Sequence, residues 1–110
     1  MNLNEKLILK ILPLGASNAK TFKELKSEHK LKMNIRTFRG FIEELRRKGY
    51  AIGAIRSNNG GYYLIESESE REKAIAQYRA QAHRELDIIY RLEQADLMKS
   101  KLAKISGGKS

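Results

Sequence analysis

Three side chains close together in the sequence have the types and spacing that contact with DNA bases requires. Arg36, Thr37 and Arg39 lie within four consecutive positions. A guanidinium group can donate two hydrogen bonds to O6 and N7 of guanine, and a threonine can contact a thymine methyl group or a phosphate. The sequence therefore offers a candidate for reading base edges, provided that one helix carries all three side chains outward.

A helix from about residue 34 to 48 would position these side chains. Asn34 is a good N-cap, because its side-chain oxygen can accept a hydrogen bond from an otherwise unpaired backbone N–H. Gly49 follows a basic last turn and predicts the end of the helix. Apolar residues recur at helical spacing and predict a face that packs on a core. That face consists of Ile35, Phe38, Ile42 and Leu45.

The candidate DNA-binding residues of this helix lie at its cap or away from its apolar face. The alternative is a surface helix on which the arginines pair with Glu43 and Glu44. Gly40 either lets a nucleic-acid backbone approach closely or is a tolerated defect that costs about 1 kcal/mol against alanine. The full candidate set is Asn34, Arg36, Thr37, Arg39, Gly40, Arg46 and Arg47.

A β-hairpin is predicted immediately after this helix. Two β-prone runs, Ile52–Arg56 and Gly61–Ile65, flank a polar turn in which Asn59-Gly60 supplies the positive φ of a tight hairpin. Tyr62 and Tyr63 alternate along the second run, so we expect one of them to face the core and the other to face solvent. The hairpin tip is a candidate for phosphate or minor-groove contact. It comprises Arg56, Ser57, Asn58 and Asn59.

Two shorter helices are predicted before residue 34. The first runs over residues 4–12 with Asn4 as its cap, and Pro13 ends it. Residues 14–19 then form a connector. Thr21 and Glu24 have the spacing of a capping box, which starts a second helix that ends near residue 29 with Phe22 and Leu25 facing inward.

Positive charge is concentrated in the first two thirds of the chain. The net charge is +9; residues 1–66 hold 13 Lys/Arg against 6 Asp/Glu, whereas residues 67–110 hold 9 against 7. A basic surface of this kind suits a polyanion such as nucleic acid, and the alternative is a basic face that only keeps the protein in solution. The candidate phosphate contacts are Lys20, Lys23, Lys30 and Lys32, with Lys26 on the same segment.

The stretch NIRTFRGFIEELRRKGYAI, followed by NNGGYYL, resembles the winged helix of DeoR-type and WYL-domain regulators and the N-terminal domain of the biotin repressor. The resemblance covers residues 3–65. It implies a winged helix-turn-helix domain of three helices plus a wing, in which helix 34–48 is the recognition helix and double-stranded DNA is the partner. Those families often have Arg-Asp where this chain has Gly40-Phe41, so one of their expected contacts is missing here.

The last third of the chain predicts one long helix. Residues 67–104 contain neither Gly nor Pro, and Ser67 and Glu70 have capping-box spacing. At 1.5 Å per residue such a helix is about 50–55 Å long. It either packs back on its own domain or pairs with a second copy, a layout similar to that of PadR-type repressors and the Bacillus replication terminator. The candidate dimerisation residues are Ile75, Tyr78, Ala82, Leu86, Ile89 and Leu92.

The composition argues against disulfides, membrane spans and metal sites. There is no cysteine, and no apolar run approaches the ~20 residues of a membrane span. His29 and His83 lack acidic neighbours at metal-ligand spacing. We therefore expect a cytoplasmic protein that is not an enzyme and that has no metal, cofactor, membrane or small-molecule partner.

The predicted fold class is mainly α with a small β-hairpin, a winged helix-turn-helix with a long C-terminal helix. The predicted divisions are a DNA-binding domain at 1–66, a dimerisation helix at 67–105 and a flexible tail at 106–110. The predicted function is a sequence-specific, dimeric regulator or repressor of bacterial or phage origin. The alternative is a winged-helix adaptor between proteins, or an accessory protein of replication initiation or termination.

Overall fold

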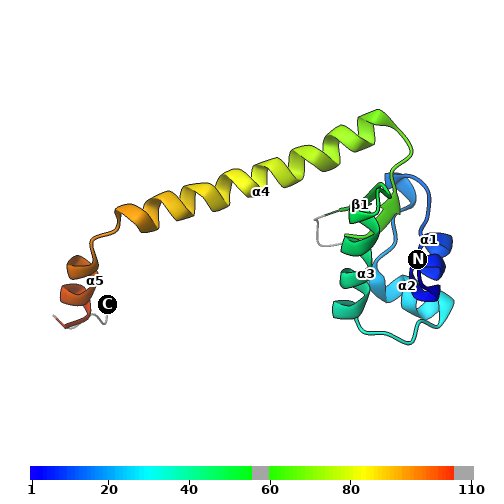
Figure 1. The fold of residues 1–110 in the computed structure, drawn as a ribbon, viewed down its shortest axis with the longest axis horizontal. Coiled ribbons are helices and arrows are strands. Elements are labelled where there is room, and N and C mark those ends of the chain that lie inside the picture. Colours follow the sequence, from blue (N-terminus) through cyan, green and yellow to red (C-terminus); the bar gives the residue numbers. More distant parts are fainter. Residues whose placement is uncertain (56–59, 106–110) are drawn as a thin grey trace. The chain divides into compact units, whose positions relative to one another are not determined.

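The computed structural model describes residues 1–55 and 60–105 of the chain, and this part is mainly helical with one two-stranded antiparallel hairpin. Contacts divide the chain into two compact units, Met1–Ala76 and Gln77–Ser110, which we describe separately. In the first unit α3 contacts both α1 and β1 (Figure 1). Within the described residues, no helix combines the length and the apolar character needed to cross a membrane.

Helix α1 (Leu3–Ile11) begins one residue earlier than predicted, and its cap lies two residues earlier. The side chain of Asn2 accepts a hydrogen bond from the Glu5 N–H at 2.8 Å, and the Glu5 carboxylate accepts one from the Asn2 N–H at 3.1 Å. The prediction of Asn4 as the cap was wrong, because only Asn2 has a glutamate three residues later to complete a capping box.

Helix α2 (Phe22–His29) starts at the predicted capping box. Thr21 Oγ1 accepts from the Glu24 N–H at 3.1 Å, and the Glu24 carboxylate accepts from the Thr21 N–H at 2.9 Å. The Thr21 N–H, followed by the Thr21 side chain, holds the pKa of Glu24 below its usual value, since hydrogen bonds to the carboxylate favour its charged form. Leu25 is buried, as predicted, and Phe22 is half-buried.

Helix α3 (Ile35–Arg47) has both predicted ends. Asn34 Oδ1 accepts from the Thr37 N–H at 2.8 Å at the start. At the other end Gly49 has φ +99°, and the N–H groups of Gly49 and Tyr50 bond to carbonyl oxygens of the last turn. This is a Schellman motif, in which glycine takes the left-handed position at no steric cost.

Strands β1 (Ile52–Ala54) and β2 (Tyr62–Leu64) pair antiparallel, with Gly53 opposite Tyr63. The predicted pairing is confirmed, over shorter strands than expected. The tyrosine prediction was wrong, since Tyr63 is buried and Tyr62 packs partly buried against the core. A Cβ on Gly53 would lie 2.3 Å from Cζ of Tyr63, so this ring occupies the space that the glycine leaves open.

The segment predicted as a plain connector covers the outer edge of β2. It contains a 3-10 turn, η1 (Ala16–Asn18), and bonds to β2 on both sides of that turn. Lys20 and Tyr62 exchange two backbone hydrogen bonds, of 3.1 and 2.8 Å. Before η1, the Gly15 N–H donates to the Leu64 carbonyl at 2.9 Å. An edge strand that would otherwise expose unpaired backbone groups is thereby closed.

The core of the first unit lies between the three helices and the hairpin. Phe38 is its centre: it is fully buried, and the rings of Phe22 and Tyr62 each lie 5.0 Å from its ring. Ile35 is 40% exposed, so the predicted apolar face of α3 is correct only for its other three members. The buried cluster comprises Ile8, Leu12, Leu25, Leu31, Phe38, Ile42, Leu45 and Ile52.

The first turn of α4 (Glu68–Gln94) is tied to the η1 segment. The Glu70 carboxylate accepts from the Ala16 N–H at 2.7 Å and from the Glu66 N–H at 2.9 Å, and these donors hold the pKa of Glu70 below its usual value. Ser67 Oγ accepts from the Glu70 N–H at 3.2 Å. Only half of the predicted Ser67–Glu70 capping box therefore forms, because the Glu70 carboxylate bonds to other backbone groups.

The prediction of one uninterrupted helix over 67–104 was wrong. Helix α4 ends at Gln94, and a second helix, α5 (Leu97–Ile105), follows. Between them Asp96 Oδ1 accepts from the N–H groups of Met98 at 2.9 Å and Lys99 at 3.2 Å. An aspartate side chain competes in this way for helical backbone donors, so it can start a new helix without Gly or Pro.

Candidate nucleic-acid interface

The outward face of α3 is held in place by its inward face. Phe38, Ile42 and Leu45 are at most 2% exposed. Because these side chains are tightly packed in the core, they fix which side of α3 faces solvent. Five of the predicted DNA-binding residues lie on the exposed side: Arg36, Thr37, Arg39, Gly40 and Arg47. The periodicity of the sequence therefore identified the exposed face of this helix.

The charges on this face are largely uncompensated. Neither Arg36 nor Arg39 forms an ion pair with another described residue, and Arg47 contacts the Glu44 carboxylate at 3.2 Å while its side chain stays 72% exposed. An ion pair as exposed as this contributes little energy and exchanges readily for another partner. Of the exposed arginines Arg36, Arg39 and Arg47, the alternative of Arg–Glu pairing thus holds only for Arg47.

Arg46 points away from this face. Its Nε donates to the backbone carbonyl of Ile52 at 2.9 Å, and the side chain is half-buried. Arg46 was predicted to lie away from the apolar face, but it lies at the border of that face and contacts β1. Its role in this structure is to join α3 to β1, and we omit it from the candidate interface.

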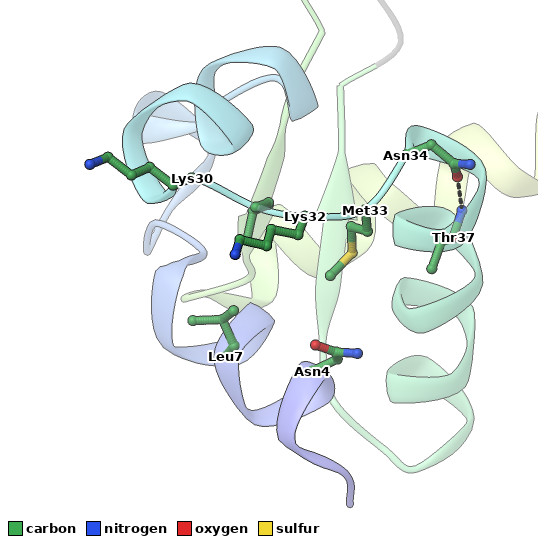
Figure 2. A pocket seen from close by; sticks show the side chains of 8 residues that line it. Asn4, Leu7, Lys30, Lys32, Met33, Asn34 and Thr37 are labelled. Carbon is green, nitrogen blue, oxygen red and sulfur yellow. Dashed lines mark hydrogen bonds between the residues drawn. The ribbon is translucent and has the colours of Figure 1, made fainter.

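An open groove brings four predicted residues together at the start of α3, three of them additional to those on its exposed side. Lys30, Lys32, Asn34 and Thr37 line it, and its volume is about 550 Å³. Figure 2 shows the Asn34–Thr37 cap on one side of the groove and the two lysines on the other. Its remaining lining residues are Asn4, Leu7, Leu31 and Met33.

The predicted lysines occupy different environments. Lys30 adopts a left-handed conformation (φ +51°, ψ +47°) that ends α2, a geometry that glycine usually provides. Lys23 and Lys32 are exposed. Lys20 is half-buried and forms an ion pair with Glu28, and the Lys26 ammonium lies 5.7 Å from the centre of the Phe22 ring. Lys23, Lys30 and Lys32 are thus the lysines best placed for phosphate.

The other predicted sites lie elsewhere. Arg56, Ser57, Asn58 and Asn59 lie outside the described residues, so their role at a hairpin tip stays a prediction. The predicted dimerisation residues all lie on α4. Five of them are 41–70% exposed: Ile75, Tyr78, Leu86, Ile89 and Leu92. Ala82 is exposed as well.

Sequence reasoning missed an ion pair between a buried glutamate of α1 and the lysine that follows α3. Glu5 of α1 is 2% exposed, and its carboxylate oxygens accept from Lys48 Nζ at 2.8 and 3.1 Å. The pKa of Glu5 is lowered, chiefly by Lys48 and then by the Asn2 N–H, and the pKa of Lys48 is raised by Glu5. A glutamate three residues after Asn2 was the only signal in the sequence, and it indicated a cap rather than a pair 43 residues apart.

The described residues include no cluster of three or more His, Cys, Asp or Glu that could hold a metal ion. Comparisons of the chain with protein-family models, curated proteins and solved structures find no significant match.

Proposed function

We propose that this protein binds double-stranded DNA through the exposed face of α3 and acts as a transcriptional regulator in the cytoplasm. In this proposal the first unit is a winged helix-turn-helix domain, α3 is its recognition helix and the β1–β2 hairpin is its wing. The observation that carries the proposal is a rigidly packed helix whose exposed face presents Arg36 and Arg39 without acidic partners among the described residues.

The dimensions of α3 support this proposal. Its 13 residues make a helix of about 20 Å, and a B-DNA major groove about 12 Å wide admits a helix. Arg36 and Thr37 lie in the first turn of α3, where helix-turn-helix proteins make most of their base contacts. Lys30 and Lys32 stand beside that turn, at positions suited to the flanking phosphates.

Selection of bound duplexes from a random pool tests the proposal most directly. We expect an enriched motif, and we expect Arg36→Ala to weaken binding to that motif by about 1–3 kcal/mol while relaxing preference at one base position. Arg84→Ala on α4 is the matched control, because it removes the same charge from an exposed position outside the first unit. Equal losses in the two variants, on all sequences, would refute base reading by α3.

The lysines predict a separate, sequence-independent effect. Lys32→Ala should weaken binding to all duplexes alike and reduce the slope of log affinity against log salt by about one unit per copy. Fluorescence anisotropy across a salt series measures this slope. Lys20→Ala is the comparison variant, because the Lys20 ammonium is already paired with Glu28, and it should change the slope less.

A second candidate function is an adaptor between proteins, including an accessory role in replication. The observation that favours it is the large amount of exposed apolar surface on α4 and α5. An adaptor that does not read bases would yield no enriched motif and would bind random duplex no better than a control protein of the same charge.

A further inference from the structure

The second unit has a large apolar surface and no core of its own. None of the described residues in 77–105 is buried. Leu86, Ile88, Ile89 and Leu92 are each more than half exposed along two turns of α4. A lone helix is marginal in water without a packing surface, so this surface is suited to another polypeptide.

The apolar and polar residues of this part of α4 lie on different sides. Tyr78, Ala82, Leu86 and Ile89 form a stripe at helical spacing, which we call the α4 stripe. On the opposite side Arg91 Nε donates to Asp87 at 2.8 Å, within the same helix. The polar side is therefore already satisfied in water, whereas Leu86 and Ile89 of the α4 stripe are more than half exposed and remain available for a packing partner.

We propose that the α4 stripe pairs with the same stripe of a second copy, antiparallel, about a two-fold axis near Leu86. Charged residues beside the α4 stripe determine which partner it binds and whether the two helices run parallel or antiparallel. Arg79 and Glu93 each lie seven residues from Leu86, on opposite sides along the helix. An antiparallel pair places Arg79 of each copy opposite Glu93 of the other, whereas a parallel pair places each charge beside its own equivalent.

The balance of charge on this part of α4 favours a second copy of the chain over a lipid surface as its partner. Residues 77–94 hold three arginines and three acidic residues, so this segment has no net charge. Helices that lie on anionic membranes instead carry an excess of lysine and arginine on their polar side. Self-pairing suits a neutral segment of this kind, because Arg79 of each copy meets Glu93 of the other.

This inference does not depend on DNA binding, so it is tested on the full chain without DNA. Light scattering across a concentration series should give the mass of two copies. Leu86→Lys should give one copy, because it places two ammonium groups at the axis. Arg84→Glu on the polar side is the matched control and should stay dimeric. A single copy for the unmodified chain at all concentrations, or a mass above two copies, would overturn the proposal.

A charge exchange tests the pairing itself. Arg79→Glu places like charges opposite each other twice per dimer and should raise the dissociation constant about tenfold or more. Glu93→Arg should do the same. The double variant Arg79→Glu/Glu93→Arg should restore the original value. Failure of the double variant to restore pairing, while both single variants weaken it, would overturn the antiparallel assignment.

Cross-linking provides an independent measure of direction, because the natural chain has no cysteine. A mixture of Arg79→Cys and Glu93→Cys chains should form an intermolecular disulfide after mild oxidation. Each variant alone should not, since its two thiols would lie about 20 Å apart along the antiparallel pair. Faster cross-linking of either variant alone would indicate a parallel pair and contradict the proposal.

Discussion

The two units of this chain differ in what stabilises them. The first unit buries a cluster of eight apolar side chains between its helices and hairpin. The second unit buries none of its described residues, although it carries Leu86, Ile88, Ile89 and Leu92 on one helix. The first unit thus has the apolar burial that folding requires, whereas the described part of the second unit leaves its large apolar side chains exposed.

The two units therefore differ in the kind of side chain that they expose. The first unit buries its apolar side chains in a core, so its exposed side chains can be charged ones suited to a specific ligand, such as Arg36 and Arg39 on α3. In the second unit, the proposed pairing would draw its association energy from exposed apolar side chains, with Arg79 and Glu93 selecting the partner and its direction.

The largest predicted effect comes from emptying the core of the first unit. Phe38→Ala should lower the free energy of unfolding by about 3–5 kcal/mol, because the ring is fully buried between Phe22 and Tyr62. Urea denaturation followed by circular dichroism measures this change. Leu86→Ala, at a side chain 60% exposed, is the comparison and should alter the unfolding of the first unit by less than about 0.5 kcal/mol. Similar losses in both variants would show that the two units are not distinct.

The Glu5–Lys48 pair predicts how the first unit responds to acid. The folded pKa of Glu5 is below its usual 4.5, so the unfolded state binds the proton more readily. The pair therefore stabilises the fold above about pH 4.5, and this contribution is lost as the pH falls through the lower, folded pKa. Denaturation at several pH values should show a shallower acid dependence for Glu5→Gln, whereas the exposed Glu43→Gln should follow the natural chain. An unchanged acid dependence in Glu5→Gln would contradict the role of the pair.

The features that the sequence predicted well depend on residues within about one helical turn of each other. The Thr21–Glu24 capping box, the Asn34 cap and the Gly49 stop each involve partners no more than a few positions apart. The apolar periodicity of α3 likewise predicted which side its arginines occupy. The mainly helical content, the two-stranded hairpin and the exposed candidate residues of α3 were therefore accessible from local pattern.

The features that were missed join distant residues. Glu5 meets Lys48, Glu70 meets Ala16, and residue 20 bonds to β2, each across tens of positions that no local pattern links. Arg46 was misplaced for a related reason, because its partner carbonyl belongs to β1 rather than to its own helix. The break at Asp96 was local but was missed, because helix propensity was judged by the lack of Gly and Pro alone.

Gly40 tests whether the exposed face of α3 is kept open for a ligand. A Cβ added there would meet nothing within 4 Å, so Gly40→Ala should raise the free energy of unfolding by about 1 kcal/mol. Gly40 lies between Arg36 and Arg47 on the exposed side, and the added methyl group should weaken DNA binding as proposed for α3. Denaturation and anisotropy on the same variant measure both effects. A more stable variant with unchanged affinity would place the DNA contact elsewhere on the unit.

The smallest predicted effect concerns the break between α4 and α5. Asp96→Ala removes the oxygen that accepts hydrogen bonds from the Met98 and Lys99 N–H groups. The loss of this cap should destabilise the broken conformation by about 1 kcal/mol. Because alanine has the highest helix propensity, the two helices should merge into the continuous helix that composition alone predicts. Backbone chemical shifts of residues 95–97 should become helical, while Asp96→Asn, which retains a capping oxygen, should keep the break. A break that persists in Asp96→Ala would show that packing, rather than this one carboxylate, separates the two helices.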